Sequence, residues 1–525
     1  MLWEPPIDPS KQEQLLLKRL TRTRKLFGFL RRQRHLLFSA EFQEELIKMY
    51  RDTGAGAPPV APAQLCCAVL LQAYLGVSDA EAVEMTVVDL RWQMVLDHLG
   101  KDTAAFGQGT LQSFRQRLIE HDLDRRLLER TVELAKDTKE FDWKKLPKGL
   151  RVAVDARPFE GAGRVEDTLN MLGHAARKMA AIVAKRRGQD LDDICKAAGT
   201  PLFAGSSLKA ALDIDWNSVE QRESALDGLC RQVFSFVGWI EKEGLSDDSE
   251  LQFYLTAAAQ VWSQNLDIIE DRFQIGHGVP SDRRISIEDA EMRHGRKSKS
   301  KTINGFKEHL AGDLDNDLVL AGAVTPANRP EGEAAESLLR DLEAQGLGQS
   351  VAELYVDRAY SDGPLAVRAL EDGGDVLCRS RSAGRSNKGR FPKTAFELDL
   401  DRMSATCPAG MTIPIRIGEV ASFPKESCAA CSKRSQCTRA TKNGRTLSIA
   451  NDENLQSILR QREQTEEGRQ QLRRRVGIEH MLAHLSARKG PRARYRGLRN
   501  NVFDTRRTAA IYNLESIHRR VAAAA

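Results

Sequence analysis

Three acidic residues lie in settings from which carboxylates can do chemistry. Asp155 and Asp357 each follow a short apolar run rich in β-branched residues, so each is expected where a strand ends. Glu479 lies in an arginine-rich segment of helical periodicity, one turn after Arg475. Alone, each acid is more simply a turn or cap residue. Together, three carboxylates on rigid elements can hold a pair of Mg²⁺ or Mn²⁺ ions, the arrangement that phosphodiester chemistry needs.

A second constellation is made of cysteines. Cys428, Cys431 and Cys437 lie in SCAACSKRSQCT, and Cys407 lies upstream in TCPAG. Two cysteines separated by two residues form a chelating pair, and four thiolates suit a closed tetrahedral Zn²⁺ site with a structural role. The last spacing is looser than in a regular zinc ribbon, so an iron–sulfur cluster and reduced cysteines in a compact loop remain alternatives. The remaining five cysteines are predicted to be small buried residues: Cys66, Cys67, Cys195, Cys230 and Cys378.

The distribution of charge points to a polyanion. A net charge of +6 over 525 residues is modest, but basic residues gather at 18–34, 293–301, 379–390 and 469–507. Such patches bind nucleic acid by displacing its counterions, although a single patch can equally be a solvated face. The strongest patch contains candidates for contact with the DNA backbone, and its tyrosine can stack on an unpaired base. These candidates are Arg475, Arg488, Lys489, Arg492, Arg494, Tyr495 and Arg496.

Periodicity along the chain predicts an α/β protein. Residues 11–136 are helical throughout, and a second helical stretch covers about 165–275. Strand signals then alternate with helices up to about residue 380, which indicates a mixed sheet covered by helices. Residues from about 383 to 450 form a loop-rich, cysteine-bearing insertion, and helices return after it. The apolar stretches are too short to span a membrane and the first residues do not resemble a signal peptide, so a cytoplasmic location without membrane partners is expected.

Several blocks of the sequence carry a resemblance to a known family. The chain resembles bacterial insertion-sequence transposases of the DDE type, in particular the group of insertion sequence 1182 within the assemblage of insertion sequences 4 and 5. The resemblance extends over almost the whole chain. The blocks that carry it are APPVAPAQLCCAVLLQAYLGVSDAEAVEMTVVDLRWQMVLDHL, FGQGTLQSFRQRL, VAVDARPFEG, DAEMRHGRKSKSKTINGFKEHLAGDLDNDLVLAGAVTPANRPEGEAAESLL, YVDRAY, the cysteine cluster, and IEHMLAHLSARKGPRARYRGLRNNVFDTRRTAAIYNL.

The resemblance implies an RNase H-like catalytic core with a mixed sheet. A helical DNA-binding domain would occupy residues 1–145, and the catalytic domain 146–525 would contain a helical insertion at about 165–275 and a cysteine-rich insertion at about 383–450. Asp155, Asp357 and Glu479 would be the catalytic metal ligands. One departure concerns the family signature around Glu479, because Leu472 and Ser486 replace its tyrosine and lysine, with Lys489 one turn later.

The same resemblance implies a function. The protein would bind the terminal inverted repeats of its element and catalyse metal-dependent strand cleavage and strand transfer on double-stranded DNA, both element ends and target. A homodimer is expected because two ends must be held together, and DNA binding would place the protein on the nucleoid. Two alternatives share the same residues: an inactive or domesticated DNA-binding regulator, and a nuclease that cuts without rejoining.

Overall fold

The computed structural model describes most of the chain. The described residues are 1–20, 24–51, 59–138, 140–141, 149–205, 207–297, 300–361, 363–381 and 389–524. The predicted domain boundary between residues 145 and 146, the expected start of the cysteine-rich insertion at 383, and parts of the basic patches at 18–34, 293–301 and 379–390 lie outside the described residues.

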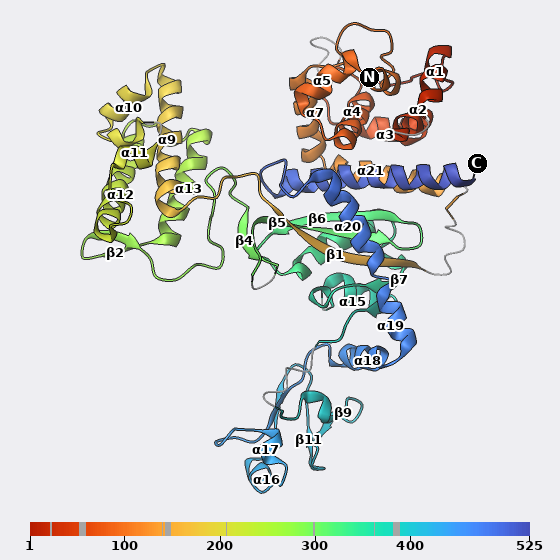
Figure 1. Cartoon of the computed structure of the whole chain (residues 1–525), viewed down its shortest axis with the longest axis vertical. Helices are drawn as coiled ribbons and strands as arrows, with labels where there is room; N and C mark the ends of the chain where they lie inside the picture. The colour runs from red at the N-terminus through yellow and green to blue at the C-terminus, as the bar shows by residue number, and fades with distance from the viewer. Residues whose placement is uncertain are drawn as a thin grey trace.

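A six-stranded mixed sheet is the centre of the molecule (Figure 1). Its strands are β1 (Leu150–Glu160), β4 (Arg293–Arg296), β5 (Thr302–Asp313), β6 (Leu318–Pro326), β7 (Val351–Tyr355) and β8 (Asp375–Leu377). The order is β4-β5-β1-β7-β8, with β6 also paired to β5. β5 is antiparallel to β1, β4 and β6, whereas β7 is parallel to both β1 and β8. The predicted α/β class is therefore confirmed.

Helices cover the sheet and join it to the N-terminal helices. Among the helices that pack on its strands are α14 (Ala335–Ala344), α15 (Pro364–Glu371), α20 (Val476–Lys489) and α21 (Leu498–Ala524). α18 (Glu453–Gln464) and α19 (Glu466–Arg473) pack on each other and precede α20. α20 lies on β1 and β5, where a Cβ at Gly312 would come within 2.5 Å of the Met481 sulfur, so this glycine permits the close approach. α21 lies between the sheet and the N-terminal helices (Figure 1).

The N-terminal unit is all helical. Its helices are α1 (Lys11–Arg19), α2 (Lys25–Leu37), α3 (Ala40–Ile47), α4 (Pro62–Leu75), α5 (Asp79–Val88), α6 (Leu90–Val95), α7 (Gln108–Glu120) and α8 (Leu123–Asp137). Capping boxes at Ser10 and Ser78 start α1 and α5. α4 is buried nearly all round, and its side chains belong to the same hydrophobic core as those of the sheet. Across the described residues no single helix is long and apolar enough to span a membrane, although α4 and α5, bent by 105°, pass together by length and composition.

Two insertions have cores of their own. The helical insertion, at one side of Figure 1, comprises α9 (Thr168–Arg187), α10 (Leu191–Ala197), α11 (Leu208–Leu212), α12 (Val219–Lys242) and α13 (Ser249–Asn265), and it ends in the hairpin of β2 (Leu266–Ile269) and β3 (Arg272–Ile275). The cysteine-rich insertion comprises β9 (Glu397–Asp399), β10 (Ser404–Thr406), β11 (Thr412–Pro414), β12 (Val420–Ser422), β13 (Thr446–Ser448), α16 (Lys425–Ala429) and α17 (Arg434–Cys437). The second was predicted as mainly loop; its short strands instead form a three-stranded and a two-stranded sheet.

Short 3-10 helices connect several of these elements. They are η2 (Pro201–Phe203), η3 (Glu331–Ala334), η4 (Gly348–Ser350), η5 (Arg358–Tyr360) and η6 (Lys393–Ala395). η3 lies against η5, where a Cβ at Gly332 would come within 2.5 Å of the Ala359 carbonyl oxygen. Because η5 follows Asp357 directly, this contact fixes the backbone next to one of the three predicted acids.

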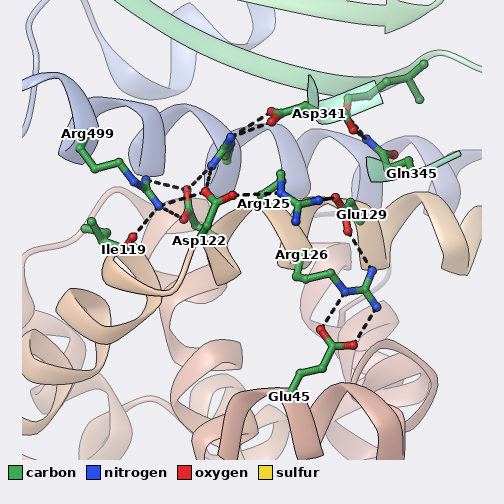
Figure 2. Close-up of polar contacts among 12 residues, drawn as sticks. Glu45, Ile119, Asp122, Arg125, Arg126, Glu129, Asp341, Gln345 and Arg499 are labelled. Atoms are coloured by element: carbon green, nitrogen blue, oxygen red, sulfur yellow. Dashed lines mark hydrogen bonds and ion pairs between the residues drawn. The ribbon is translucent and has the colours of Figure 1, made fainter. Parts of the chain in front are cut away.

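A network of ion pairs joins the N-terminal helices to α21 and α14. Figure 2 shows part of it, running from Glu45 on α3 through the arginines of α8 to Asp341 on α14. At its centre Arg506 of α21 hydrogen-bonds three carboxylates, with Nη–O distances of 2.7 Å to Asp122, 3.2 Å to Asp124 and 2.9 Å to Asp341. Arg499 also contacts Asp122 and Asp124. We call these five residues the Arg506 cluster.

Candidate active site

The sheet brings Asp155 and Asp357 side by side. β1 and β7 run parallel, and Ala153 pairs with Tyr355, so each acid stands two residues beyond this pair. β7 ends at Tyr355, as predicted, but β1 does not end at Asp155. It continues to Glu160 because β5 goes on pairing with it past the end of β7. Asp155 therefore lies where β1 loses one of its two neighbours, which leaves its side chain a path towards Asp357.

Glu479 reaches the same place from α20. Ile478, Met481, Leu482 and Leu485 are buried and fasten this helix to the sheet. Glu479 lies in the first turn, where the partial positive charge of the helix terminus favours a carboxylate. The predicted helical setting of Glu479 is confirmed, and the helix start is directed at the ends of β1 and β7.

Arg475, the residue before α20, touches all three acids. Its Nη1 lies 3.4 Å from Asp155 Oδ1 and 3.2 Å from Asp357 Oδ1, and its Nη2 donates a 3.1 Å hydrogen bond to Glu479 Oε1. We call these four residues the Arg475 cluster. The three acids singled out in the sequence thus converge on one guanidinium, although they are separated by up to 324 residues in the chain. Three carboxylates share a single positive charge there.

The surroundings of Asp155 in this cluster disfavour the ionised form of its carboxyl. Its side chain is 15% exposed, and burial raises the pKa of its carboxyl. The Ala156 N–H and Arg475 lower that pKa, while the like charges of Asp357 and Glu479 raise it further, and the net direction is upward. A carboxyl with a raised pKa beside two other carboxylates identifies a place where an additional cation would lower the electrostatic energy.

A fourth acid near this cluster was not identified from the sequence. Burial raises the pKa of Glu331, the first residue of η3; Lys307 opposes that shift, and the charges of Asp357 and Asp155 reinforce it. The Lys307 Nζ lies 3.9 Å from Glu331 Oε1. Its only sequence signal is an acid directly after Pro330, which is typical of an ordinary helix start.

Two buried polar side chains support η5 behind the acids. His309 Nδ1 lies 2.6 Å from the Tyr360 hydroxyl, and His309 Nε2 lies 2.8 Å from Thr325 Oγ1. Burial lowers the pKa of His309 to about 3, so the ring is neutral at physiological pH. Burial and the neighbouring acids hold the pKa of Tyr360 well above its ordinary value. This neutral pair fixes the segment after Asp357 without adding charge to the site.

A cavity of about 690 Å³ opens beside the acids. Asp357 and Glu479 line one part of it. Five arginines also line it, together with Glu463 and several apolar side chains; the arginines are Arg358, Arg379, Arg469, Arg473 and Arg475. Most of these lie in or next to the basic patches seen in the sequence, but four of them were not predicted as site residues. Carboxylates at the rim of an arginine-lined cavity suit an anionic substrate whose reacting group meets a metal.

The segment predicted to contact DNA is used largely within the protein. Arg488 pairs with Glu515 and donates to the Tyr74 carbonyl. Lys489 is 5% exposed, and its Nζ lies 2.5 Å from Glu308 and 3.6 Å from Asp504. A buried ammonium with two carboxylate partners is not available to a phosphate, so the assignment of Lys489 as a DNA contact does not fit this structure.

The three remaining arginines of this segment also have partners, but their side chains are exposed. Arg492 donates to the carbonyls of Gly161 and Ala162, and Arg494 to those of Gly76 and Val77. Arg496 pairs with Glu288. Tyr495 is half-buried, with the guanidinium groups of Arg115 and Arg507 over its ring. These residues tie β1, the N-terminal helices and the loop before β4 together.

The four clustered cysteines line one cavity of about 350 Å³. The Arg445 N–H points at Cys428 Sγ, 3.5 Å away. Burial raises the pKa of the Cys437 thiol; Arg445 opposes that shift and the other three cysteines reinforce it. Among the residues that the structure describes, however, no group of three or more His, Cys, Asp or Glu side chains stands close enough to hold a metal ion, at the cysteines or at the acids. The other five cysteines are buried, as predicted.

Two family models match parts of the chain. The model described as a transposase DDE domain matches residues 406–518, and the model described as a transposase domain (DUF772) matches residues 16–117. The first match includes Glu479 but neither Asp155 nor Asp357. Together the matches support a DDE transposase of an insertion sequence, a class of DNA-transposing enzyme that uses divalent metal in general. No curated protein and no solved structure matches the chain significantly.

Proposed function

We propose that this chain is a transposase of the insertion sequence 1182 group that binds the terminal inverted repeats of its element and catalyses strand cleavage and strand transfer. The observation that carries the proposal is the convergence of Asp155, Asp357 and Glu479 on Arg475 at the rim of an arginine-lined cavity. Both family matches support it from independent parts of the chain.

The chemistry of the donor set suits a pair of hard divalent cations, although among the described residues the three acids do not stand close enough to hold a metal ion in this structure. Asp155, Asp357 and Glu479 supply carboxylate oxygens, the ligands that Mg²⁺ and Mn²⁺ prefer, and these residues would hold the metal. A cation already stands among them, because the guanidinium of Arg475 lies within 3.4 Å of all three. When bound, a metal pair supplies activation of the attacking oxygen and stabilisation of the leaving oxygen.

The protein itself supplies position and charge. Two acids come from neighbouring strands and the third from a helix fastened to the same sheet, so their relative placement is rigid. Arg358, Arg379 and Arg473 are exposed at the cavity, where they can bind DNA phosphates on either side of the reacting one. His309 and Tyr360 hold the segment that follows Asp357.

The core is proposed to be RNase H-like. Its support is the mixed sheet, in which β5 is antiparallel to both β1 and β6, β7 is parallel to both β1 and β8, and acids beside the central strands face a helix at the sheet surface. Helices α1–α8 are proposed to bind the element ends, and a homodimer to hold two ends together. A band-shift with inverted-repeat DNA, compared with a shuffled duplex, tests the binding.

The cysteine-rich insertion is proposed to bind Zn²⁺ as a structural ion. The support is chemical: four thiols border one cavity in a unit whose core is small, and small units commonly need such a staple. Metal analysis of purified protein, with Cys428→Ser and Cys431→Ser as comparisons, tests it. About one zinc per chain that is lost in the variants is expected; iron instead would favour a cluster, and neither metal would contradict the proposal.

Cleavage of end DNA by full-length protein tests the catalytic assignment. Asp155→Asn, Asp357→Asn and Glu479→Gln are each expected to lower Mg²⁺-dependent cleavage by more than about 100-fold, since even outer partners of metal ligands are worth 10–100-fold. Asp248→Asn is the matched control, because Asp248 also pairs with an arginine but lies in the helical insertion.

The products distinguish the alternatives. Joining of the cleaved end to a second DNA is expected of a transposase. Cleavage without joined products would favour a nuclease, and specific end binding without cleavage would favour a regulator. Unchanged cleavage in all three acid variants would show that the site is assigned wrongly.

A further inference from the structure

Arg475 makes weak hydrogen bonds although three carboxylates surround its guanidinium. Within the described part of the chain its Nη1 is buried and has no hydrogen-bond partner, although it lies 3.2 Å and 3.4 Å from two carboxylate oxygens. The distances to the three acids are all above 3.0 Å. Charge-assisted hydrogen bonds of a guanidinium are normally shorter, about 2.7–2.9 Å. The side chain is thus held among the acids mainly by charge.

Arg506 shows what a structural arginine among three acids looks like in this fold. Each of its three carboxylates is hydrogen-bonded to it, and its Nη2 contacts both oxygens of Asp341. Within the described residues its buried Nε has no hydrogen-bond partner, but both terminal nitrogens do. Arg506 is 3% exposed, whereas Arg475 is 25% exposed and borders the cavity. The Arg475 side chain therefore has weaker hydrogen bonds than Arg506, and the adjoining cavity gives it room to move away from the acids.

We propose that Arg475 is a resident counter-ion of the active site, which holds the three carboxylates together without metal and leaves them for the cavity when divalent cations bind. This inference rests on the proposed function, because it requires that Asp155, Asp357 and Glu479 are the metal ligands. The guanidinium and the metal then compete for the same oxygens. Arg475 is a positioning residue before metal binding, and the same side chain is released towards the DNA phosphates after it.

The competition has a definite sign. Without Arg475 the metal-free protein loses the guanidinium that pairs with all three carboxylates, so its metal-free form becomes less stable while its metal-bound form changes little. Metal affinity must therefore rise, and linkage makes the effect reciprocal: bound metal must raise the exposure of the Arg475 guanidinium. A residue that instead helped to build the metal site would have the opposite effect on affinity.

Mn²⁺ titration of the full-length protein, followed by the electron paramagnetic resonance signal of free Mn²⁺, tests this. Arg475→Gln is expected to bind Mn²⁺ on the order of tenfold more tightly than wild type, within the usual range of coupling between sites. Its metal-free thermal midpoint should fall, and Mn²⁺ should raise that midpoint by more than in wild type.

The Mn²⁺ affinity of Arg475→Lys, which keeps the charge, should lie between those of wild type and Arg475→Gln. Arg473→Gln, which removes an exposed arginine from the same cavity, is the control and should leave Mn²⁺ affinity within about twofold of wild type.

The outcomes separate the inference from the proposed function. Equal or weaker Mn²⁺ binding by Arg475→Gln, while Asp155→Asn and Glu479→Gln lose binding, would overturn the counter-ion role and leave the active site intact. If Asp155→Asn and Glu479→Gln bind Mn²⁺ as wild type does, the metal-ligand assignment itself fails. In wild type, Mn²⁺ should speed the modification of Arg475 by an arginine-specific dicarbonyl reagent, read by peptide mass; protection by Mn²⁺ would also overturn the inference.

Discussion

Two arginines of this protein each stand among three carboxylates, yet the two clusters are built differently. In the Arg506 cluster a second arginine, Arg499, also contacts two of the three acids. Asp124 and Asp341 are almost fully buried there. In the Arg475 cluster one guanidinium serves all three acids, and Asp357 and Glu479 are about half exposed. The first cluster joins helices from distant parts of the chain (Figure 2), and the second borders a cavity.

The difference lies in how the charge is balanced. Burial disfavours the charge of Asp122, but Arg506, Arg125 and Arg499 outweigh it and lower its pKa. For Asp155 the balance goes the other way, because two acids and burial outweigh one arginine. In the structural cluster too, burial raises the pKa of Asp341, with the charge of Asp122 adding to the shift and Arg506 opposing it. What distinguishes a candidate site here is therefore a deficit of positive charge next to open space, not the presence of a perturbed acid.

The largest effect that this comparison predicts is on stability. Arg506→Met should lower the free energy of unfolding by about 3–5 kcal/mol, because it leaves the buried Asp341 without its arginine and removes one of the two arginines that pair with Asp124. Arg475→Gln should lower it by only about 1.4 kcal/mol, the free-energy equivalent of the tenfold change in metal affinity expected of this variant. Urea unfolding of the metal-free proteins, followed by circular dichroism, measures both. Similar losses for the two variants would show that the clusters do not differ in the way their contacts suggest.

Breaking the ion pair between Lys489 and Glu308 should lower the free energy of unfolding by less than Arg506→Met does. Glu308 is fully buried with Lys489, Arg157 and Thr505, and although burial opposes it, the two cations lower the pKa of Glu308. Lys489→Met should cost about 1.5–3 kcal/mol, the value of hydrogen bonds to a charged group, since Glu308 keeps two partners.

The same variant separates a structural lysine from one that binds DNA. Lys489→Met should leave the salt dependence of DNA binding unchanged, whereas a lost phosphate contact would lower the slope by about one. Arg496→Gln, a surface arginine of the same segment, serves as the comparison. A reduced slope for Lys489→Met would restore the original assignment of this residue.

The sequence allowed the three acids to be named because each lies beside an element with a clear period, a β-branched run or an amphipathic helix. It did not show that β1 continues past Asp155, because that depends on pairing with β5, which is distant in the chain. Nor did it distinguish buried from free basic residues: Lys489 and Arg506 lie in the same arginine-rich stretch as Arg473, and only tertiary contacts separate them. Glu331 was missed because its role depends on which carboxylates the fold places near it.

The exposed arginines of the cavity predict a moderate effect on DNA binding. Arg379→Gln and Arg473→Gln should each lower the slope of log affinity against log salt by about one, if each binds one phosphate. Arg186→Gln, which removes a surface arginine paired with Asp248 on the helical insertion, should leave the slope unchanged. Fluorescence anisotropy with end DNA at several salt concentrations measures this. An equal change in all three variants would mean that the cavity makes no special contribution.

The smallest predicted effect is a difference of sign between two acids. The pKa of Asp155 is raised in the folded state, so its ionised form opposes folding at neutral pH, and this cost disappears as pH falls through that pKa to the ordinary value. Metal-free Asp155→Asn should therefore be slightly more stable than wild type at pH 7, and the gain should vanish near pH 4.

The pKa of Asp122 is lowered, so its charge stabilises the folded state above the ordinary pKa, and this stabilisation is lost as pH falls. Asp122 has φ 54°, a conformation that asparagine tolerates, so Asp122→Asn should be less stable at pH 7 and equal to wild type in acid. Chemical unfolding at several pH values compares the two. The same sign for both variants would remove the electrostatic distinction between the two clusters.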